Sequence, residues 1–223
     1  MGDLAKNASG DQPQLEWREG GVPVATRFDD PYFSLQGGLA ETRHVFLAGN
    51  GLPDRLRPGF HVAELGFGTG LNALALASVA TCPVVMTSFE AYPMDRAQLE
   101  QAHAAFPQLA DLSARLRAGW PGVRIQLGQV DLRLVIGDVA QTLPDWTGAA
   151  DAWFLDGFSP AKNPQMWADE VMMQVGRHTA AGGSFATYTA AGHVRRALSE
   201  AGFQVTRQPG FGRKRHMSVG HMP

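Results

Sequence analysis

The chain has 223 residues and a formal net charge of −2, with 44% hydrophobic and 18% charged residues, a composition typical of a globular domain. Its single cysteine excludes an internal disulfide, and no cysteine or histidine pair has metal-ligand spacing, so we expect no metal. No signal-peptide run and no apolar stretch of the ~20 residues that span a membrane occur, so we expect a cytoplasmic protein. The near-zero charge argues against non-specific coating of nucleic acid.

The N-terminal part of the chain differs from the rest. We expect residues 1–14 to form a flexible leader and residues 15–223 to form a single domain. Within that domain, residues 15–59 contain short β-prone pieces, a helical stretch between Gly38 and Leu47 and a Pro-containing turn. We call residues 15–59 the lid segment.

A regular alternation of apolar strands and helical stripes begins at residue 60. We predict a hairpin around residues 128–129 and a final antiparallel pair near the C-terminus. The other strands are predicted at 61–65, 84–89, 152–155 and 184–188. Strands separated by helices indicate βαβ units and a mostly parallel, doubly wound α/β sheet over residues 60–223. Such sheets bind ligands at the carboxyl ends of their strands.

The first strand of this alternation ends in a glycine-rich turn. Its sequence is Glu64-Leu65-Gly66-Phe67-Gly68-Thr69-Gly70, and Leu71-Asn72 open the next helix. Glycine permits positive φ and close backbone approach to a ligand, and a helix N-terminus favours polar or anionic groups. The G-x-G-x-G spacing differs from the G-x-G-x-x-G of dinucleotide sites, and the preceding acid favours a nucleoside-methionine site. A merely tight connection is the alternative.

Two carboxylates follow the next strands in an order that suits adenosine. Glu90 lies twenty residues after Gly70 and could accept hydrogen bonds from both ribose hydroxyls. Asp138 follows the strand at 132–136 and could accept one from the adenine amine. A surface glutamate and a helix-capping aspartate are the alternatives. Together with the glycine spacing, the pattern favours S-adenosylmethionine as cofactor.

Asp156 is the catalytic candidate, because it follows an apolar strand at the mouth of the predicted sheet. A carboxylate beside a transferable methyl group could hold a substrate ammonium and receive its proton, and the freed lone pair could then attack. Phe158 could stack on a base. The alternative for Asp156 is a cap on the turn at Gly157.

A basic segment near the C-terminus contrasts with the acidic remainder. Six basic residues face one acidic residue between Arg195 and His216, a local charge of +5. Its loop Phe211-Gly212-Arg213-Lys214-Arg215 could hold phosphates and stack a base. A solvated charged turn is the alternative.

Several motifs occur together in one known family. They are Phe28-Asp29-Asp30-Pro31-Tyr32-Phe33-Ser34, Glu41-Thr42-Arg43-His44-Val45-Phe46, Gly66 to Asn72, Phe154 to Pro164 and Gly210 to Met217. From Leu15 onward the sequence resembles the methyltransferase domain of the bacterial bifunctional tRNA 5-methylaminomethyl-2-thiouridine biosynthesis proteins.

This resemblance implies a seven-stranded sheet of the class I S-adenosylmethionine-dependent methyltransferase type. The implied activity is N-methylation of the 5-aminomethyl group of the tRNA wobble (2-thio)uridine, with the anticodon stem-loop as partner. A separate flavin-dependent oxidase would act earlier in the pathway. The cofactor residues would be Glu64, Gly66, Gly68, Gly70, Asn72, Glu90 and Asp138. The substrate residues would be Asp30, Tyr32, Phe33, Phe158, Lys162, Arg213, Lys214 and Arg215.

Other functions remain open at this point. A small-molecule amine N-methyltransferase or an aminopropyl transferase would also place a carboxylate beside an amine. A nicotinamide oxidoreductase is disfavoured by the glycine spacing. A non-catalytic RNA-binding module would need only the basic loop.

Overall fold

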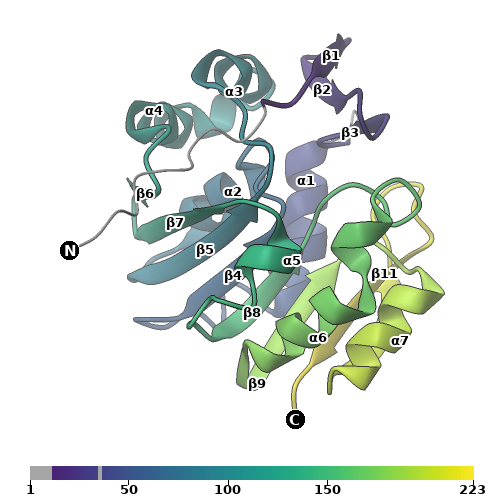
Figure 1. Cartoon of the computed structure of the whole chain (residues 1–223). Helices are drawn as coiled ribbons and strands as arrows, with labels where there is room; N and C mark the ends of the chain where they lie inside the picture. Colours follow the sequence, from purple (N-terminus) through teal and green to yellow (C-terminus); the bar gives the residue numbers. More distant parts are fainter. Residues whose placement is uncertain (1–11, 35–36) are drawn as a thin grey trace.

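The computed structural model describes residues 12–34 and 37–223, so most of the predicted leader lies outside the described residues. An eight-stranded sheet carries helices on both faces, and a small three-stranded sheet lies beyond one end of it (Figure 1). The strands are β1 (Leu15–Arg18), β2 (Val22–Ala25), β3 (Asp30–Pro31), β4 (His61–Leu65), β5 (Val84–Glu90), β6 (Arg124–Leu127), β7 (Val130–Ile136), β8 (Ala150–Leu155), β9 (Thr179–Thr187), β10 (Gln204–Pro209) and β11 (His216–His221).

The helices alternate with these strands. They are α1 (Gly38–Thr42), α2 (Leu71–Val79), α3 (Arg96–His103), α4 (Ala110–Gly119), α5 (Val139–Thr142), α6 (Asp169–Arg177) and α7 (Gly192–Glu200). Shorter π and 3-10 turns are η1 (Arg43–Leu47), η2 (Ala48–Asn50), η3 (Pro107–Leu109) and η4 (Pro164–Trp167). Across residues 12–34 and 37–223, every helix falls short of the length and apolar character that a membrane span needs.

The main sheet has the order β10-β11-β9-β8-β4-β5-β7-β6. Its five central strands are parallel, and the strands at both edges are antiparallel to their neighbours. From β4 the chain moves outward to β5 and β7, whereas from β8 it moves the opposite way to β9. The strand order therefore reverses between β4 and β8, where doubly wound sheets form their ligand crevice. The α/β class is confirmed, with eight strands instead of the expected seven, because β6 also joins the sheet.

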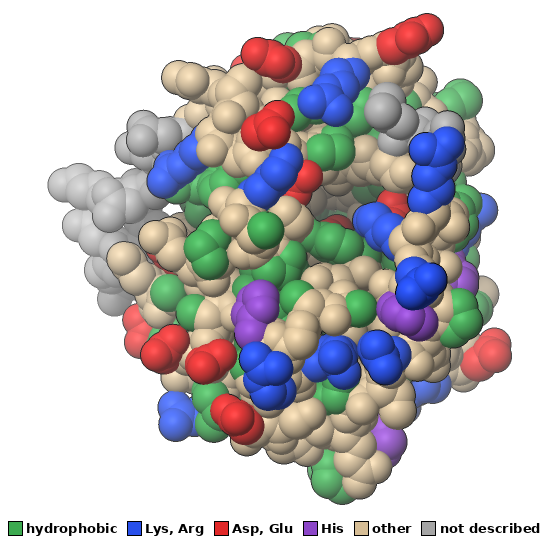
Figure 2. Space-filling model, turned by 90° about the vertical axis from the view of Figure 1, so that its right-hand side faces the viewer, with side chains coloured by type: hydrophobic (Ala, Val, Ile, Leu, Met, Phe, Trp, Pro, Cys, Tyr) green, Lys and Arg blue, Asp and Glu red, His purple; other side chains and the backbone are tan. Residues whose placement is uncertain are grey.

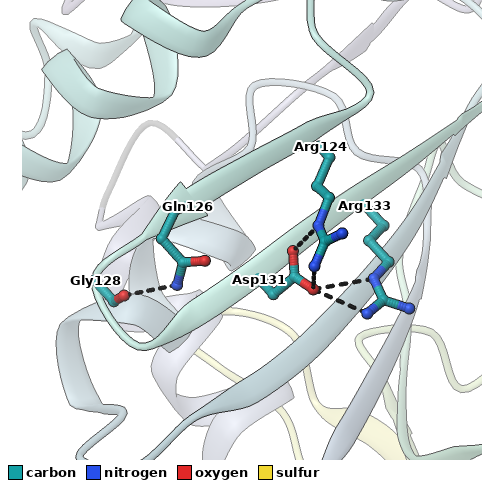
Figure 3. A network of polar contacts seen from close by, with 5 residues as sticks. All are labelled: Arg124, Gln126, Gly128, Asp131 and Arg133. Carbon is teal, nitrogen blue, oxygen red and sulfur yellow. Dashed lines mark hydrogen bonds and ion pairs between the residues drawn. The ribbon is translucent and has the colours of Figure 1, made fainter.

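The hairpin that adds β6 is closed by a polar network at the edge of the sheet (Figure 3). The Asp131 carboxylate accepts hydrogen bonds from the guanidinium groups of Arg124 and Arg133. Both arginine side chains are exposed, so water screens these ion pairs and they add little to stability. Charges on an edge strand also discourage pairing with another chain. This network therefore protects the edge of the sheet.

Two hydrophobic clusters cover the two faces of the sheet. One contains buried residues of α1, η1, α2, α3 and α4, and the other contains Leu143 just after α5 and buried residues of η4, α6 and α7. Adjacent residues of β4 divide between them, since Val62 belongs to the first cluster and Ala63 to the second. Helices on both faces explain why the central strands are continuous apolar runs. Helix α4 was not predicted, because Ser113 and Leu116 are its only buried residues.

Candidate functional site

A cavity of about 680 Å³ lies at the carboxyl ends of β4, β5, β7, β8 and β9. The lid segment and the loop between β10 and β11 complete its wall, and Figure 2 shows a hollow on this side of the molecule. Most of the predicted site residues line it: Asp30, Tyr32, Phe33, Gly66, Gly68, Asn72, Glu90, Asp138, Asp156, Phe158, Arg213 and Lys214. Glu64, Gly70, Lys162 and Arg215 are not among the lining residues.

The glycine turn after β4 has the backbone conformation that its sequence suggested. Gly66, Gly68 and Gly70 have φ of +77°, +54° and +74°. A Cβ atom on Gly66 would lie 3.2 Å from Cα of Gly157, so the turn directly contacts the loop after β8. Gly70 instead precedes α2, and a Cβ there would meet the Phe67 ring at 2.6 Å. Gly66 and Gly68 thus shape the cavity, whereas Gly70 permits the packing beneath it.

The Glu90 carboxylate stands at the end of β5 and faces this turn. One oxygen accepts the Gly68 N–H at 2.7 Å and the other accepts the Tyr92 N–H at 2.7 Å. Burial raises the pKa of Glu90, and these backbone hydrogen bonds oppose the rise. Each carboxylate oxygen has a second lone pair, so Glu90 can still accept hydrogen bonds from two hydroxyl groups. This donor and acceptor pattern fits a ribose diol.

Asp138 serves as a helix cap and also lines the cavity. Its Oδ1 accepts the Ala140 N–H at 2.9 Å at the start of α5. The capping interpretation and the binding interpretation are therefore compatible, because a carboxylate has lone pairs for both interactions.

Asp156 is connected to Glu64 through the side chain of Asn72. The Asn72 amide donates to Oε1 of Glu64 and to Oδ2 of Asp156, each at 2.8 Å. Glu64 is fully buried, also accepts a hydrogen bond from Ser88, and has a pKa raised by burial. Glu64 therefore lies behind the cavity wall and supports the group that orients Asp156.

The electrostatic setting of Asp156 suits a proton acceptor. Burial raises the pKa of its carboxyl to about 6, opposed by hydrogen bonds from Gly157 and Asn72. Its Oδ1 accepts the Gly157 N–H at 2.8 Å, so the predicted turn cap is present as well. At neutral pH the group is ionised, yet its pKa is close enough to neutrality for proton exchange.

The lid segment is bound to the loop after Asp156. Asp30 accepts the Ser159 N–H at 2.8 Å, and Lys162 donates to the backbone oxygen and the carboxylate of Asp29. The ring of Phe158 stacks on Phe28 with centroids 4.6 Å apart. The structure therefore places Lys162 in a contact that holds the lid segment, outside the cavity lining.

Two aromatic residues of the lid segment reach the cavity in different ways. Tyr32 meets the Phe158 ring edge-on at 5.0 Å, and burial raises the pKa of its phenol, which stays protonated. Phe33 is 9% exposed and packs edge-on against Phe106 at 4.9 Å. Both side chains thus line the cavity, and Phe33 also anchors the segment to the core.

Glu41 and Tyr188 line the cavity but were not selected as site residues from the sequence. Tyr188 directly follows β9, and its hydroxyl donates to the Gly157 carbonyl at 2.8 Å. The strand-end rule could have identified it, because it follows a parallel strand. Glu41 lies on α1, where the only signal was its presence in a family motif.

The basic loop divides between the cavity and solvent. Arg213 and Lys214 line the cavity, whereas Arg215 is exposed outside it. Lys and Arg side chains gather around the hollow (Figure 2). Within residues 12–34 and 37–223, no group of three or more His, Cys, Asp or Glu residues is arranged to hold a metal ion.

Comparisons with known proteins identify relatives of this chain. Residues 100–223 match the model of a family described as S-adenosyl-L-methionine-dependent methyltransferase. Two proteins named tRNA 5-methylaminomethyl-2-thiouridine biosynthesis bifunctional protein MnmC, from Caulobacter vibrioides and Ralstonia nicotianae, are each 47% identical to it. The matches cover 90% and 91% of this chain but 36% and 33% of those proteins. The chain thus spans about a third of the length of these relatives.

Solved structures support the fold. MNMC2 from Aquifex aeolicus matches with a TM-score of 0.74 and 22% identity, covering 97% of this chain and 73% of that one. Precorrin-6y C5,15-methyltransferase from Geobacter metallireducens matches with a TM-score of 0.56 and 12% identity, covering 93% and 100%. The predicted dependence on S-adenosylmethionine is confirmed by the family match. This chain belongs to the S-adenosyl-L-methionine-dependent methyltransferase family.

Proposed function

We propose that this chain methylates the amine nitrogen of the 5-aminomethyl group on the wobble (2-thio)uridine of tRNA. The observation that carries the proposal is the Asp156 carboxylate, held at the strand-order reversal between the glycine turn and a basic rim. The names of the two MnmC relatives support tRNA as the substrate.

The cofactor fits the side of the cavity formed by β4, β5 and β7. Gly66 and Gly68 allow close approach of a ligand, Glu90 can accept hydrogen bonds from ribose hydroxyls, and Asp138 can accept one from the adenine amine. S-adenosylmethionine, when bound, supplies a methyl group activated by a sulfonium sulfur.

The acceptor side prepares the amine. A primary alkylamine is mostly protonated at neutral pH, so its nitrogen has no free lone pair. The ionised Asp156 carboxylate attracts this ammonium and accepts its proton, and the amine becomes nucleophilic within the cavity. The hydrogen bonds from Asn72 and Gly157 hold the carboxylate in one orientation, which reduces the entropic cost of reaction.

The basic rim favours a nucleic-acid acceptor over a free amine. Arg213 at the cavity wall and the exposed Arg215 beside it could bind phosphates on either side of the wobble nucleotide. A flavin-dependent oxidase acting earlier, as the family resemblance implies, would be the source of the amine on this RNA.

The test is methyl transfer to an anticodon stem-loop that carries 5-aminomethyluridine at the wobble position. We expect mass spectrometry of the digested RNA to find 5-methylaminomethyluridine, and a stem-loop with plain uridine to stay unmodified. Methylation of the free nucleoside but not of the RNA would contradict the proposal and favour a small-molecule amine methyltransferase. No methylation of either would favour a non-catalytic RNA-binding module.

A further inference from the structure

The ammonium group of Lys214 occupies a defined position in the cavity wall. Its Nζ donates to Oε1 of Glu41 at 2.7 Å and lies 4.3 Å from the centroid of the Tyr188 ring. A carboxylate and the face of an aromatic ring are the two groups that proteins combine to bind alkylammonium ions. The position of the Lys214 ammonium is therefore chemically suited to an alkylammonium ion.

The two groups around this ammonium come from parts of the chain other than the β10–β11 loop. The side chain of Glu41 is 13% exposed on α1, and the hydroxyl of Tyr188 is tied to the Gly157 carbonyl. Burial raises the pKa of Tyr188, so its ring remains a neutral phenol. The Tyr188 ring is thus held in the wall by a contact that does not involve Lys214, and Glu41 reaches the same point from α1.

This position lies beside the catalytic candidate. Tyr188 contacts Gly157, which directly follows Asp156, and all three line the same cavity. The charge of Lys214 lowers the pKa of Asp156, and the charge of Glu41 raises it, as expected of close neighbours. An ammonium that replaced Lys214 would therefore lie within the field of Asp156.

Lys214 itself is held weakly. Its side chain is 47% exposed, and partly exposed ion pairs contribute little stability because water screens them. It belongs to the β10–β11 loop, in which Gly212 has φ of +61° with open space around it. The side chain can leave the site without disturbing the core.

We propose that Glu41 and Tyr188 form an ammonium subsite that Lys214 fills in the free protein and that the aminomethyl ammonium of the acceptor fills during binding. Both ligands end in the same CH₂–NH₃⁺ group. The displaced Lys214 joins Arg213 and Arg215 in contacting the RNA backbone. This inference rests on the proposed function. It also explains how the site would distinguish an acceptor that carries the amine from one that does not, because an acceptor without the amine leaves Lys214 in place.

The chain has three lysines, at positions 6, 162 and 214, so ¹³Cε-lysine labelling gives a simple NMR spectrum. The Tyr188 ring should displace the Lys214 resonance from the ordinary lysine position, and loss of that peak in Lys214→Arg assigns it. With S-adenosylhomocysteine present to prevent turnover, a stem-loop carrying 5-aminomethyluridine should return the resonance to the ordinary position. A stem-loop with plain uridine is the matched control and should leave it displaced.

Either of two results overturns the proposal while methylation of the RNA stands: no movement of the Lys214 resonance at saturation, or equal movement with both stem-loops. A second titration does not require RNA to be the substrate. n-Propylammonium chloride should move the Lys214 resonance in the wild type but not in Glu41→Gln, whereas equal concentrations of sodium chloride should not. Equal movement of the Lys214 resonance with both salts would indicate charge screening alone and would also contradict the proposed subsite.

Discussion

The two sides of the cavity are built in different ways. The side proposed to bind the cofactor, called the cofactor side, consists of loops that directly follow β4, β5 and β7, with glycines in positive φ and Glu90 bonded to backbone N–H groups. The side proposed to bind the acceptor, called the acceptor side, combines the lid segment (including α1), Tyr188 and the β10–β11 loop, which ion pairs and aromatic contacts hold together.

This difference indicates that the cofactor side is rigid and the acceptor side adaptable. Backbone hydrogen bonds and buried turns fix the cofactor side, as suits a ligand that is always the same. Half-exposed ion pairs on the acceptor side can exchange partners at low cost. The effects of substitutions on the two sides should therefore differ both in what they change and in how large they are.

The largest effect is expected for Asp156→Asn, which lies between the two sides. Loss of the proton acceptor should lower kcat about 10²- to 10⁴-fold in a methyl-transfer assay. Asp138→Asn is the control on the cofactor side and should raise KM for S-adenosylmethionine with kcat little changed. Burial raises the pKa of Asp156 above its unfolded value, so the ionised group opposes folding at neutral pH. Asp156→Asn should then unfold at no lower temperature at pH 7, and a marked fall would attribute the activity loss to misfolding.

A second test addresses the contact between the glycine turn and the loop after β8. Gly66→Ala adds a Cβ atom 3.2 Å from the Gly157 backbone, and positive φ adds strain of about 1–2 kcal/mol. Gly59→Ala carries similar strain at φ of +81° with nothing within 4 Å. Gly66→Ala should lose at least as much stability as Gly59→Ala in urea unfolding, but only Gly66→Ala should lose affinity for S-adenosylhomocysteine by calorimetry, about tenfold or more. Equal affinities would show that this contact does not shape the cofactor side.

The basic rim should affect RNA binding and leave cofactor binding unchanged. Replacing Arg213 and Arg215 with alanine should lower the affinity for the stem-loop. The slope of log K against log salt concentration should become shallower by about 0.7 to 0.9 for each lost phosphate contact. Arg115→Ala with Arg177→Ala removes the same charge from exposed positions outside the cavity lining and is the control. Fluorescence anisotropy across a salt series measures both. Identical salt slopes in the two double variants would show that the loop does not contact RNA phosphates.

The pH dependence should report the neighbours of Asp156. Because its pKa is about 6 and the carboxylate must be ionised, kcat/KM should fall as pH decreases through about 6. Lys214→Met removes a charge that lowers this pKa, so the acid limb should move to higher pH. Glu41→Gln removes a charge that raises it, so the limb should move to lower pH. If the acid limbs of the two variants moved in the same direction, the placement of Lys214 and Glu41 beside Asp156 would be contradicted.

The smallest effect is expected for Lys162→Ala. The Lys162 ammonium lies 3.2 Å from the exposed Asp29 carboxylate and 3.8 Å from that of Asp30, and its own side chain is 37% exposed, so its loss should cost about 1 kcal/mol or less in urea unfolding. KM for the stem-loop should change little. A large rise in KM at unchanged stability would instead support the substrate-binding role predicted from the sequence.

Much of the cofactor side could be predicted from the sequence because its signals are local. Gly66, Glu90 and Asp138 each follow an apolar strand within two residues, and parallel strands bring their carboxyl ends to one edge. The capping box that Asp95 and Gln98 form before α3 is another feature that a short-range pattern encodes. Helix α6 begins only at Asp169, because residues 164–167 form a 3-10 turn that starts at Pro164.

The sequence by itself determined the α/β alternation, the glycine turn and the carboxylates at the strand ends, since each depends on residues close in the chain. Only the tertiary structure decided which side chains lie across the cavity from the glycine turn and the strand-end carboxylates. The bond between Lys214 and Glu41 joins residues 173 apart, and the contact of Lys162 with Asp29 joins residues 133 apart. No periodicity encodes such pairs, because they arise when separate segments pack around one cavity. The acceptor side of this methyltransferase is therefore a product of the fold, whereas its cofactor side follows from the sequence.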